Sequence, residues 1–210
     1  MDVIEHDNHI SLEQYEKIKL KYGSMSSWAI WSDQGEKIKS NMGDISFFEN
    51  PTIKTLKTLN PNIILVGLNI SKHIPKNFSN FHPDYSSAQD YKTRYALKNT
   101  MFWGAYMTDI IKDFEEKVSG NMMKYLSKNK TFEKENILKF EEELVDIGSK
   151  SPIIIAFGND SYKILHRNIK KYKIYKVSHY SSFINKDKYR DEFIKLEIEL
   201  IKDLKKIISL

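Results

Sequence analysis

Four short runs of apolar, largely β-branched residues constrain the fold of this chain more than any other feature. They span residues 62–69, 104–111, 152–157 and 173–178, and turn-forming residues bound them. Their apolar character is continuous rather than alternating, which is typical of strands that are covered on both faces of a parallel sheet. We therefore expect these four segments to form the centre of the molecule.

Helical patterns lie before, between and after the strands. We expect helices over residues 12–22, 86–98, 131–147, 161–168 and 189–208, with Ser86 or Ser87 capping the second of them. This alternation predicts an α/β fold, namely a three-layer α/β/α sandwich with a mostly parallel four-stranded central sheet. We expect a single domain over residues 1–210. It consists of an N-terminal extension (1–60) packed on the core, a motif-bearing core (62–183) and a C-terminal helix (187–210).

Composition excludes several classes of protein. The chain is 40% hydrophobic and 12% aromatic, which is too apolar for a disordered protein. It has no cysteine, which excludes disulfides, a thiolate nucleophile and cysteine-ligated zinc or iron–sulfur sites. No apolar run approaches the roughly 20 residues of a membrane helix. We expect a soluble, cytoplasmic monomer without membrane contact. The net charge of +5 suits a polyanionic partner, although AT-biased coding also produces such lysine-rich chains.

The candidate functional residues follow the strands, because ligands of parallel sheets bind beyond the carboxyl ends of the strands. The first strand runs into Gly67-Leu68-Asn69-Ile70-Ser71, which is neither a Walker loop nor a dinucleotide fingerprint. The other three strands end at Asp109, at Asn159 and at His179, and Phe78 or Phe81 offers a stacking face. This combination suits a nucleobase better than a phosphate. Each residue also has a structural interpretation, as a turn, cap, ion-pair or core residue.

In order and spacing, these residues resemble the motifs of the uracil-DNA glycosylase superfamily. Residues 67–71 (GLNIS) are similar to its GQDPY, GINPG and GMNPG motifs, and residues 179–183 (HYSSF) are similar to HPSPLS or NPSGLS. Residues 106–109 (YMTD) and 154–158 (IIAFG) resemble its two middle strands, and Phe81 stands where the family has a stacking phenylalanine. The resemblance covers residues 62–183 and favours the asparagine-type branches without an iron–sulfur cluster.

The resemblance implies a monofunctional DNA glycosylase that removes uracil or a related deaminated base in base excision repair. Asn69 would position the attacking water, and His179 would bind the base oxygen on which charge develops. The base would be flipped out of the DNA and stacked on Phe81. The implied base-binding residues are Gly67, Leu68, Phe81, Asp109 and Asn159. The implied DNA contacts are Ser71, Ser181, Ser182, Phe183, Lys186, Lys188 and Arg190. No metal and no cofactor are expected.

The chain departs from the family pattern at three positions. Ile70 and Tyr180 replace the prolines of the two terminal motifs, and Asp109 replaces the asparagine that reads the uracil edge. A protonated Asp109 would match uracil, whereas an ionised one would favour a base with a donor such as an exocyclic amine. Two alternatives therefore stay open. One is a catalytically inactive member that binds DNA or a free nucleobase, and the other is an unrelated α/β enzyme acting on nucleosides.

Overall fold

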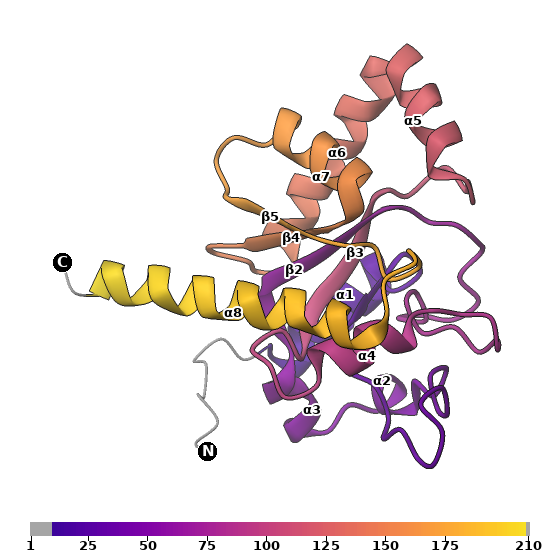
Figure 1. Ribbon diagram of the computed structural model, residues 1–210, viewed down its shortest axis with the longest axis vertical. Coiled ribbons are helices and arrows are strands. Elements are labelled where there is room, and N and C mark those ends of the chain that lie inside the picture. The colour runs from indigo at the N-terminus through magenta and orange to yellow at the C-terminus, as the bar shows by residue number, and fades with distance from the viewer. Residues whose placement is uncertain (1–9, 209–210) are drawn as a thin grey trace.

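One mixed sheet of five strands, in the order β1-β3-β2-β4-β5, organises the computed structural model, which describes residues 10–208 (Figure 1). The strands are β1 (Ser26–Trp28), β2 (Asn60–Asn69), β3 (Ala105–Ile111), β4 (Ile153–Phe157) and β5 (Ile174–Val177). Neighbours among β2 to β5 pair in parallel, and β1 pairs antiparallel with β3. The mostly parallel α/β/α fold is confirmed, with five strands rather than the four expected. Residues 1–9 of the expected extension and 209–210 of the expected last helix lie outside the described residues.

Helices cover both faces of the sheet. They are α1 (Leu12–Tyr22), α2 (Ser46–Glu49), α3 (Ile53–Thr58), α4 (Tyr91–Leu97), α5 (Ser119–Lys128), α6 (Lys130–Asp146), α7 (Gly158–Asn168) and α8 (Lys186–Ile208). Side chains of α4 and α8 belong to the core on one face, and those of α1, α5, α6 and α7 belong to the core on the other. Within residues 10–208, no helix has the length and apolarity needed to cross a membrane.

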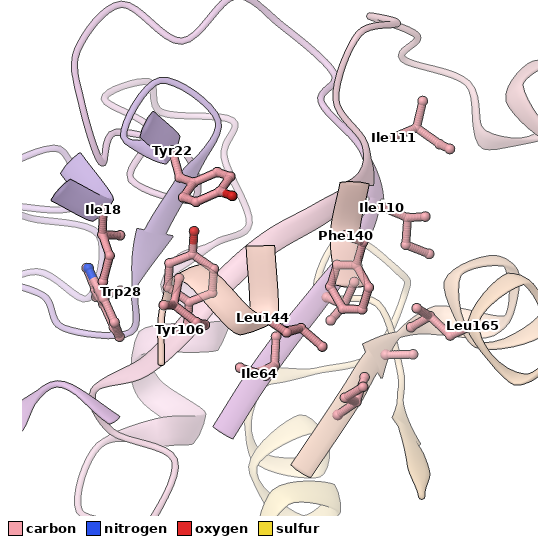
Figure 2. Close-up of a cluster of buried hydrophobic side chains, with 14 of the residues drawn as sticks. Ile18, Tyr22, Trp28, Ile64, Tyr106, Ile110, Ile111, Phe140, Leu144 and Leu165 are labelled. Carbon is pink, nitrogen blue, oxygen red and sulfur yellow. The ribbon is translucent and has the colours of Figure 1, made fainter. Parts of the chain in front are cut away.

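The central strand β2 supplies both cores. Ile64 and Val66 point to the face covered by α1, α6 and α7, whereas Ile63 and Leu65 point to the face covered by α4 and α8. Figure 2 shows the first of these cores, in which Ile64 lies with Phe140 and Leu144 of α6. Burial on both faces explains why the strand sequence is continuously apolar.

Among the helices that lie between strands, two begin three or more residues from the expected position. The helix expected from residue 86 begins only at Tyr91, and Asp90 is its N-cap residue, so the predicted cap at Ser86 or Ser87 is wrong. The helix expected from residue 161 begins at Gly158, directly after β4. Gly158 has a φ of 83°, a left-handed conformation that glycine adopts without strain.

A buried ion pair joins β3 to α6. Lys112 Nζ lies 2.6 Å from Glu143 Oε2, and the two side chains are 6% and 0% exposed. The hydroxyls of Tyr106 and Thr108 donate to Glu143 Oε1 over 2.7 and 3.0 Å. Lys112 Nζ also donates to the main-chain carbonyl of Asp109 over 2.6 Å. The network therefore fixes the end of β3 on the face of the sheet that α6 covers.

Breaking this pair should cost far more than the pair itself contributes. Glu143→Gln leaves the Lys112 ammonium buried without a counter-charge, so we expect the free energy of unfolding to fall by about 3 kcal/mol or more. The exposed neighbour change Glu142→Gln is the control and should stay within about 0.5 kcal/mol. Urea denaturation measures both. The pair Lys112→Met with Glu143→Leu should recover most of the loss, and an undiminished loss would contradict this account.

Candidate functional site

Gly67 and Asp109 lie side by side at the carboxyl ends of the two central strands. They are register partners in the parallel pairing of β2 with β3. A Cβ atom on Gly67 would overlap Asp109 Oδ1, and it would lie 3.7 Å from Cε1 of Phe81. The missing side chain at Gly67 is therefore what admits the carboxylate to this position. Asp109 and Phe81 are 4% and 7% exposed.

Asn80 ties the loop before α4 to the Asp109 carboxylate. Its Nδ2 donates to Asp109 Oδ2 over 2.9 Å and to the carbonyl of Met25 over 3.1 Å. Its Oδ1 accepts from the main-chain N–H of Phe81 over 3.1 Å. Phe81 has a φ of 64°, which is strained for a residue with a side chain. These bonds hold the strained residue with its ring beside Gly67.

His179, which follows β5, packs against Gly158 in the turn after β4. The position of a Cβ on Gly158 is 3.2 Å from the His179 Cβ, so glycine allows the two segments to approach closely. The ring of Phe157 lies between Phe81, at 6.2 Å between ring centroids, and His179, at 6.5 Å. Tyr180 stacks on His179 with a centroid distance of 4.3 Å and is edge-on to Phe157 at 5.6 Å.

The hydrogen bonds of His179 define its tautomer. The main-chain N–H of Ser181 donates to Nδ1 over 3.2 Å, and the Ser181 hydroxyl is 2.8 Å from the same atom. Because Nδ1 accepts, the neutral ring carries its proton on Nε2. Burial lowers the pKa of His179 to about 4, which keeps the ring neutral at physiological pH. His179 can therefore donate one hydrogen bond through Nε2.

Two buried carboxyl groups share this part of the molecule. Burial raises the pKa of Asp109 to about 6, against the hydrogen bond from Asn80 and the charge of Lys112. Burial also raises the pKa of Asp90 to about 7, and the neighbouring charge of Asp109 adds to the effect. The nearby Tyr180 hydroxyl opposes that rise in the pKa of Asp90. A carboxylate with a raised pKa close to a second one is typical of functional sites.

Asn69 lies at the end of β2 with its amide group anchored. Nδ2 donates to the carbonyl of Ile70 over 2.9 Å and to that of Glu116 over 2.7 Å. Both donor hydrogens are thereby used, and no group among residues 10–208 donates to Oδ1. The orientation is suited to an Oδ1 that accepts a hydrogen bond from water.

Three residues expected to contact the ligand have other surroundings. Asn159 is exposed, and its Oδ1 accepts from Lys176 over 2.9 Å, so the structure does not bring it to the Asp109 cluster. Phe78 belongs to the core on the opposite face of the sheet. Leu68 is buried in that same core. Of the two phenylalanines, Phe81 is therefore the one whose ring lies beside Gly67.

The residues expected to contact DNA divide into two groups. Ser71, Phe183 and Lys188 are exposed, as are Ser181 and Ser182. The other two have partners of their own: Lys186 pairs with Asp187 over 2.7 Å, and Arg190 donates to carbonyls at the end of α4. Arg190 therefore caps a helix.

Sequence reasoning missed the roles of Asn80, Asp90 and Tyr180. Asp90 lies within the helix expected over residues 86–98, and no local pattern distinguishes a buried aspartate from an exposed capping one. Asn80 sits in a polar loop, and its partner Asp109 is 29 residues away in the chain. The sequence identified Tyr180 only as the replacement for a proline, and its stacking on His179 was not predicted.

A cavity of about 230 Å³ opens on the opposite face of the sheet. It is lined by Lys21, Tyr22, Met25, Lys112, Asp113, Lys139 and Glu142. Each of its three lysines pairs with a carboxylate, which leaves no uncompensated positive charge for an anionic ligand. Among the described residues, no three His, Asp or Glu side chains are grouped to hold a metal ion. We therefore place the candidate site at the Asp109 cluster.

The raised pKa of Asp90 predicts a pH-dependent stability. Between about pH 4 and pH 7 the folded chain holds a proton on Asp90 that the unfolded chain has released, so stability falls as the pH rises. Asp90→Asn removes this loss. We expect the variant to gain stability relative to wild type by up to about 1.4 kcal/mol per pH unit across that window. Urea denaturation at pH 5 and pH 7.5 measures the difference, and a constant difference would contradict the buried-acid assignment.

Comparison of the chain with protein-family models, with curated proteins and with solved structures gives no match. The site is therefore interpreted from its own geometry and from the motifs of the sequence.

Proposed function

We propose that the chain is a monofunctional DNA glycosylase that removes uracil or a related deaminated base from DNA. The observation that carries the proposal is the meeting of Gly67, Phe81, Asp109 and His179. They come from four different segments of the chain and gather by the carboxyl ends of β2 and β3, where the ring of Phe157 links Phe81 to His179. Phe81, Asp109 and His179, together with Asn69 two residues after Gly67, form the ordered set that resembles the glycosylase motifs.

The groups of this cluster suit cleavage of an N-glycosidic bond. A flipped base would stack against Phe81, and the Nε2 proton of His179 would bind the base oxygen. The bond between C1′ and the base nitrogen breaks, and the base leaves with the electron pair. Negative charge then grows on the base oxygen, which His179 stabilises. A water held by Asn69 Oδ1 adds to C1′ and releases a proton to solvent.

The segment after His179 supplies the proposed DNA contact. Phe183 is fully exposed, which is unusual for so large an apolar ring, and it lies beside Ser181 and Ser182. An exposed apolar side chain of this kind can fill the space that a flipped base vacates. Lys188 follows at the start of α8, and the net charge of +5 favours a polyanion.

The first test is a cleavage assay on a single-stranded oligonucleotide that contains one uracil. We expect wild type to produce alkali-labile abasic sites. We expect His179→Ala to lose roughly 10²- to 10³-fold in rate, the usual cost of removing one donor to a developing oxyanion. Asn69→Ala should yield far fewer abasic sites as well, because the water loses its acceptor. Asn50→Ala, an exposed change at the end of α2, is the control.

Two results would speak against catalysis. Intact strands with uracil, hypoxanthine and xanthine alike, from folded protein, would contradict the proposal. DNA binding that survives Asn69→Ala and His179→Ala without any turnover would favour a non-catalytic binding protein instead. A salt titration of that binding would count the phosphate contacts, because log affinity falls linearly with log salt concentration.

A further inference from the structure

A buried lysine on α4 has no counter-charge. Lys92 is 6% exposed, and no carboxylate among residues 10–208 forms an ion pair with its ammonium. The buried Lys112 differs, because its ammonium lies 2.6 Å from Glu143. Arg94, which is also buried on α4, donates to three main-chain carbonyls. An ammonium that is withdrawn from water without such compensation is costly, so Lys92 is suited to an anion from outside the chain.

The charged end of Lys92 reaches the turn after β5. Its Nζ donates to the main-chain carbonyl of Ser182 over 3.2 Å, and Ser182 is exposed. An ammonium has three N–H donors, and the other two have no acceptor within the part of the chain that the structure describes. The aliphatic stem is thus covered while the ammonium lies at an exposed turn. Two donors remain for a ligand there.

A second lysine lies close by. Lys39 Nζ is 5.0 Å from the ring centroid of Tyr91, the residue before Lys92, and it donates to the carbonyl of Ser86 over 2.6 Å. Lys39 is exposed and forms no ion pair within residues 10–208. Burial lowers the pKa of Lys92, and the like charge of Lys39 lowers it further. The first turn of α4 therefore carries two positive charges without an ion-pair partner.

We propose that Lys92 and Lys39 bind a phosphate group of a nucleic-acid strand that passes over the turn at residues 179–183. A phosphate suits this site because its oxygens accept from several N–H donors at once and its charge compensates both ammonium groups. Lys92 supplies the fixed contact, since its stem is packed, and Lys39 supplies an exposed one. The inference rests on the proposed function only for the choice of a nucleic acid as the source of the phosphate.

The position of the turn favours a nucleic-acid strand over a free anion. Ser182 follows His179, the proposed donor to the base, by three residues, and the fully exposed Phe183 comes next. A strand that delivers a base to His179 carries its backbone past this turn. Helix α4 lies beside the first turns of α8, where Arg190 donates to carbonyls at the end of α4 (Figure 1). The lysine contacts would therefore orient the strand without reading its sequence.

Lys92→Met separates a ligand contact from a structural role, because it keeps the length of the stem and removes the charge. A lysine that only holds the turn would lose protein stability and DNA affinity together. A lysine that serves a ligand costs stability in the free protein. We therefore expect the urea midpoint of Lys92→Met to stay unchanged or to rise, while DNA affinity falls.

The test follows binding of a single strand of about 15 nucleotides that contains no damaged base, by fluorescence anisotropy between about 50 and 200 mM salt. We expect Lys92→Met to bind about tenfold more weakly at the lowest salt concentration, since one charged contact is lost. The slope of log affinity against log salt should become shallower by about 0.7, the change for one phosphate of a single strand. Lys39→Met should make the slope shallower as well.

The matched control is Lys163→Met, which removes an exposed charge from α7 on the opposite face of the sheet. It should leave both affinity and slope unchanged. A second strand of the same sequence carries uncharged methylphosphonate linkages, and wild type and Lys92→Met should bind it equally. Inorganic phosphate, titrated by calorimetry, is the third probe and tests for a site that takes a free anion.

Three outcomes would overturn the inference. An unchanged salt slope in Lys92→Met excludes a phosphate contact. An equal loss on the charged and uncharged strands, with a lower urea midpoint, assigns a structural role to Lys92. Binding of inorganic phosphate that depends on Lys92, with unchanged DNA affinity, assigns the site to a free anion.

The proposed function is judged separately, because these strands contain no base to remove. A Lys92 effect on DNA binding without cleavage of the uracil strand would reject catalysis and keep the inference. Cleavage of the uracil strand with an unchanged salt slope in Lys92→Met would reject the inference and keep catalysis.

Discussion

The double burial of β2 is the constraint on which the site depends. Each side chain of this strand must fit one of two cores, so the strand cannot shift along its neighbours without exposing apolar groups on both faces. The fixed register places Gly67 opposite Asp109. Because Gly67 has no side chain, the carboxylate occupies space above the strand that any other residue would fill. Core packing thus determines where the Asp109 carboxylate lies.

Buried charge is compensated on one face of the sheet and not on the other. On the face covered by α6, Glu143 contacts the Lys112 ammonium and two hydroxyls, so its charge is compensated. On the opposite face, Asp109 has the Asn80 amide as its hydrogen-bond partner and a second acid, Asp90, as its neighbour. Such an arrangement costs stability. The first face therefore anchors the strand, while the second holds two carboxyl groups, Asp109 and Asp90, whose pKa values burial raises to about 6 and about 7.

Local pattern was enough to predict β2, β3 and β4, because each is an apolar run buried on both faces. It also predicted β5, an edge strand in which Val177 alone is fully buried. It missed β1, whose three residues, Ser26–Trp28, are too short to show a period, and α5, which opens on turn-like residues (SGN) and is stabilised by burying Met122 and Leu126. The ends of the strands also indicated Gly67, Phe81, Asp109 and His179. Asn80 and Asp90 could not be found in this way, because their roles arise from contacts between distant segments.

The tautomer of His179 connects the local turn to the chemistry proposed for the site. The main-chain N–H of Ser181 occupies Nδ1, so the proton must sit on Nε2, and burial keeps the ring from gaining a second one. A neutral imidazole is a weaker acid than an imidazolium, so it would stabilise an anionic base without transferring the proton to it. A neutral donor suits a leaving group that becomes charged only as the bond breaks, because it attracts the anion more than the ground-state base.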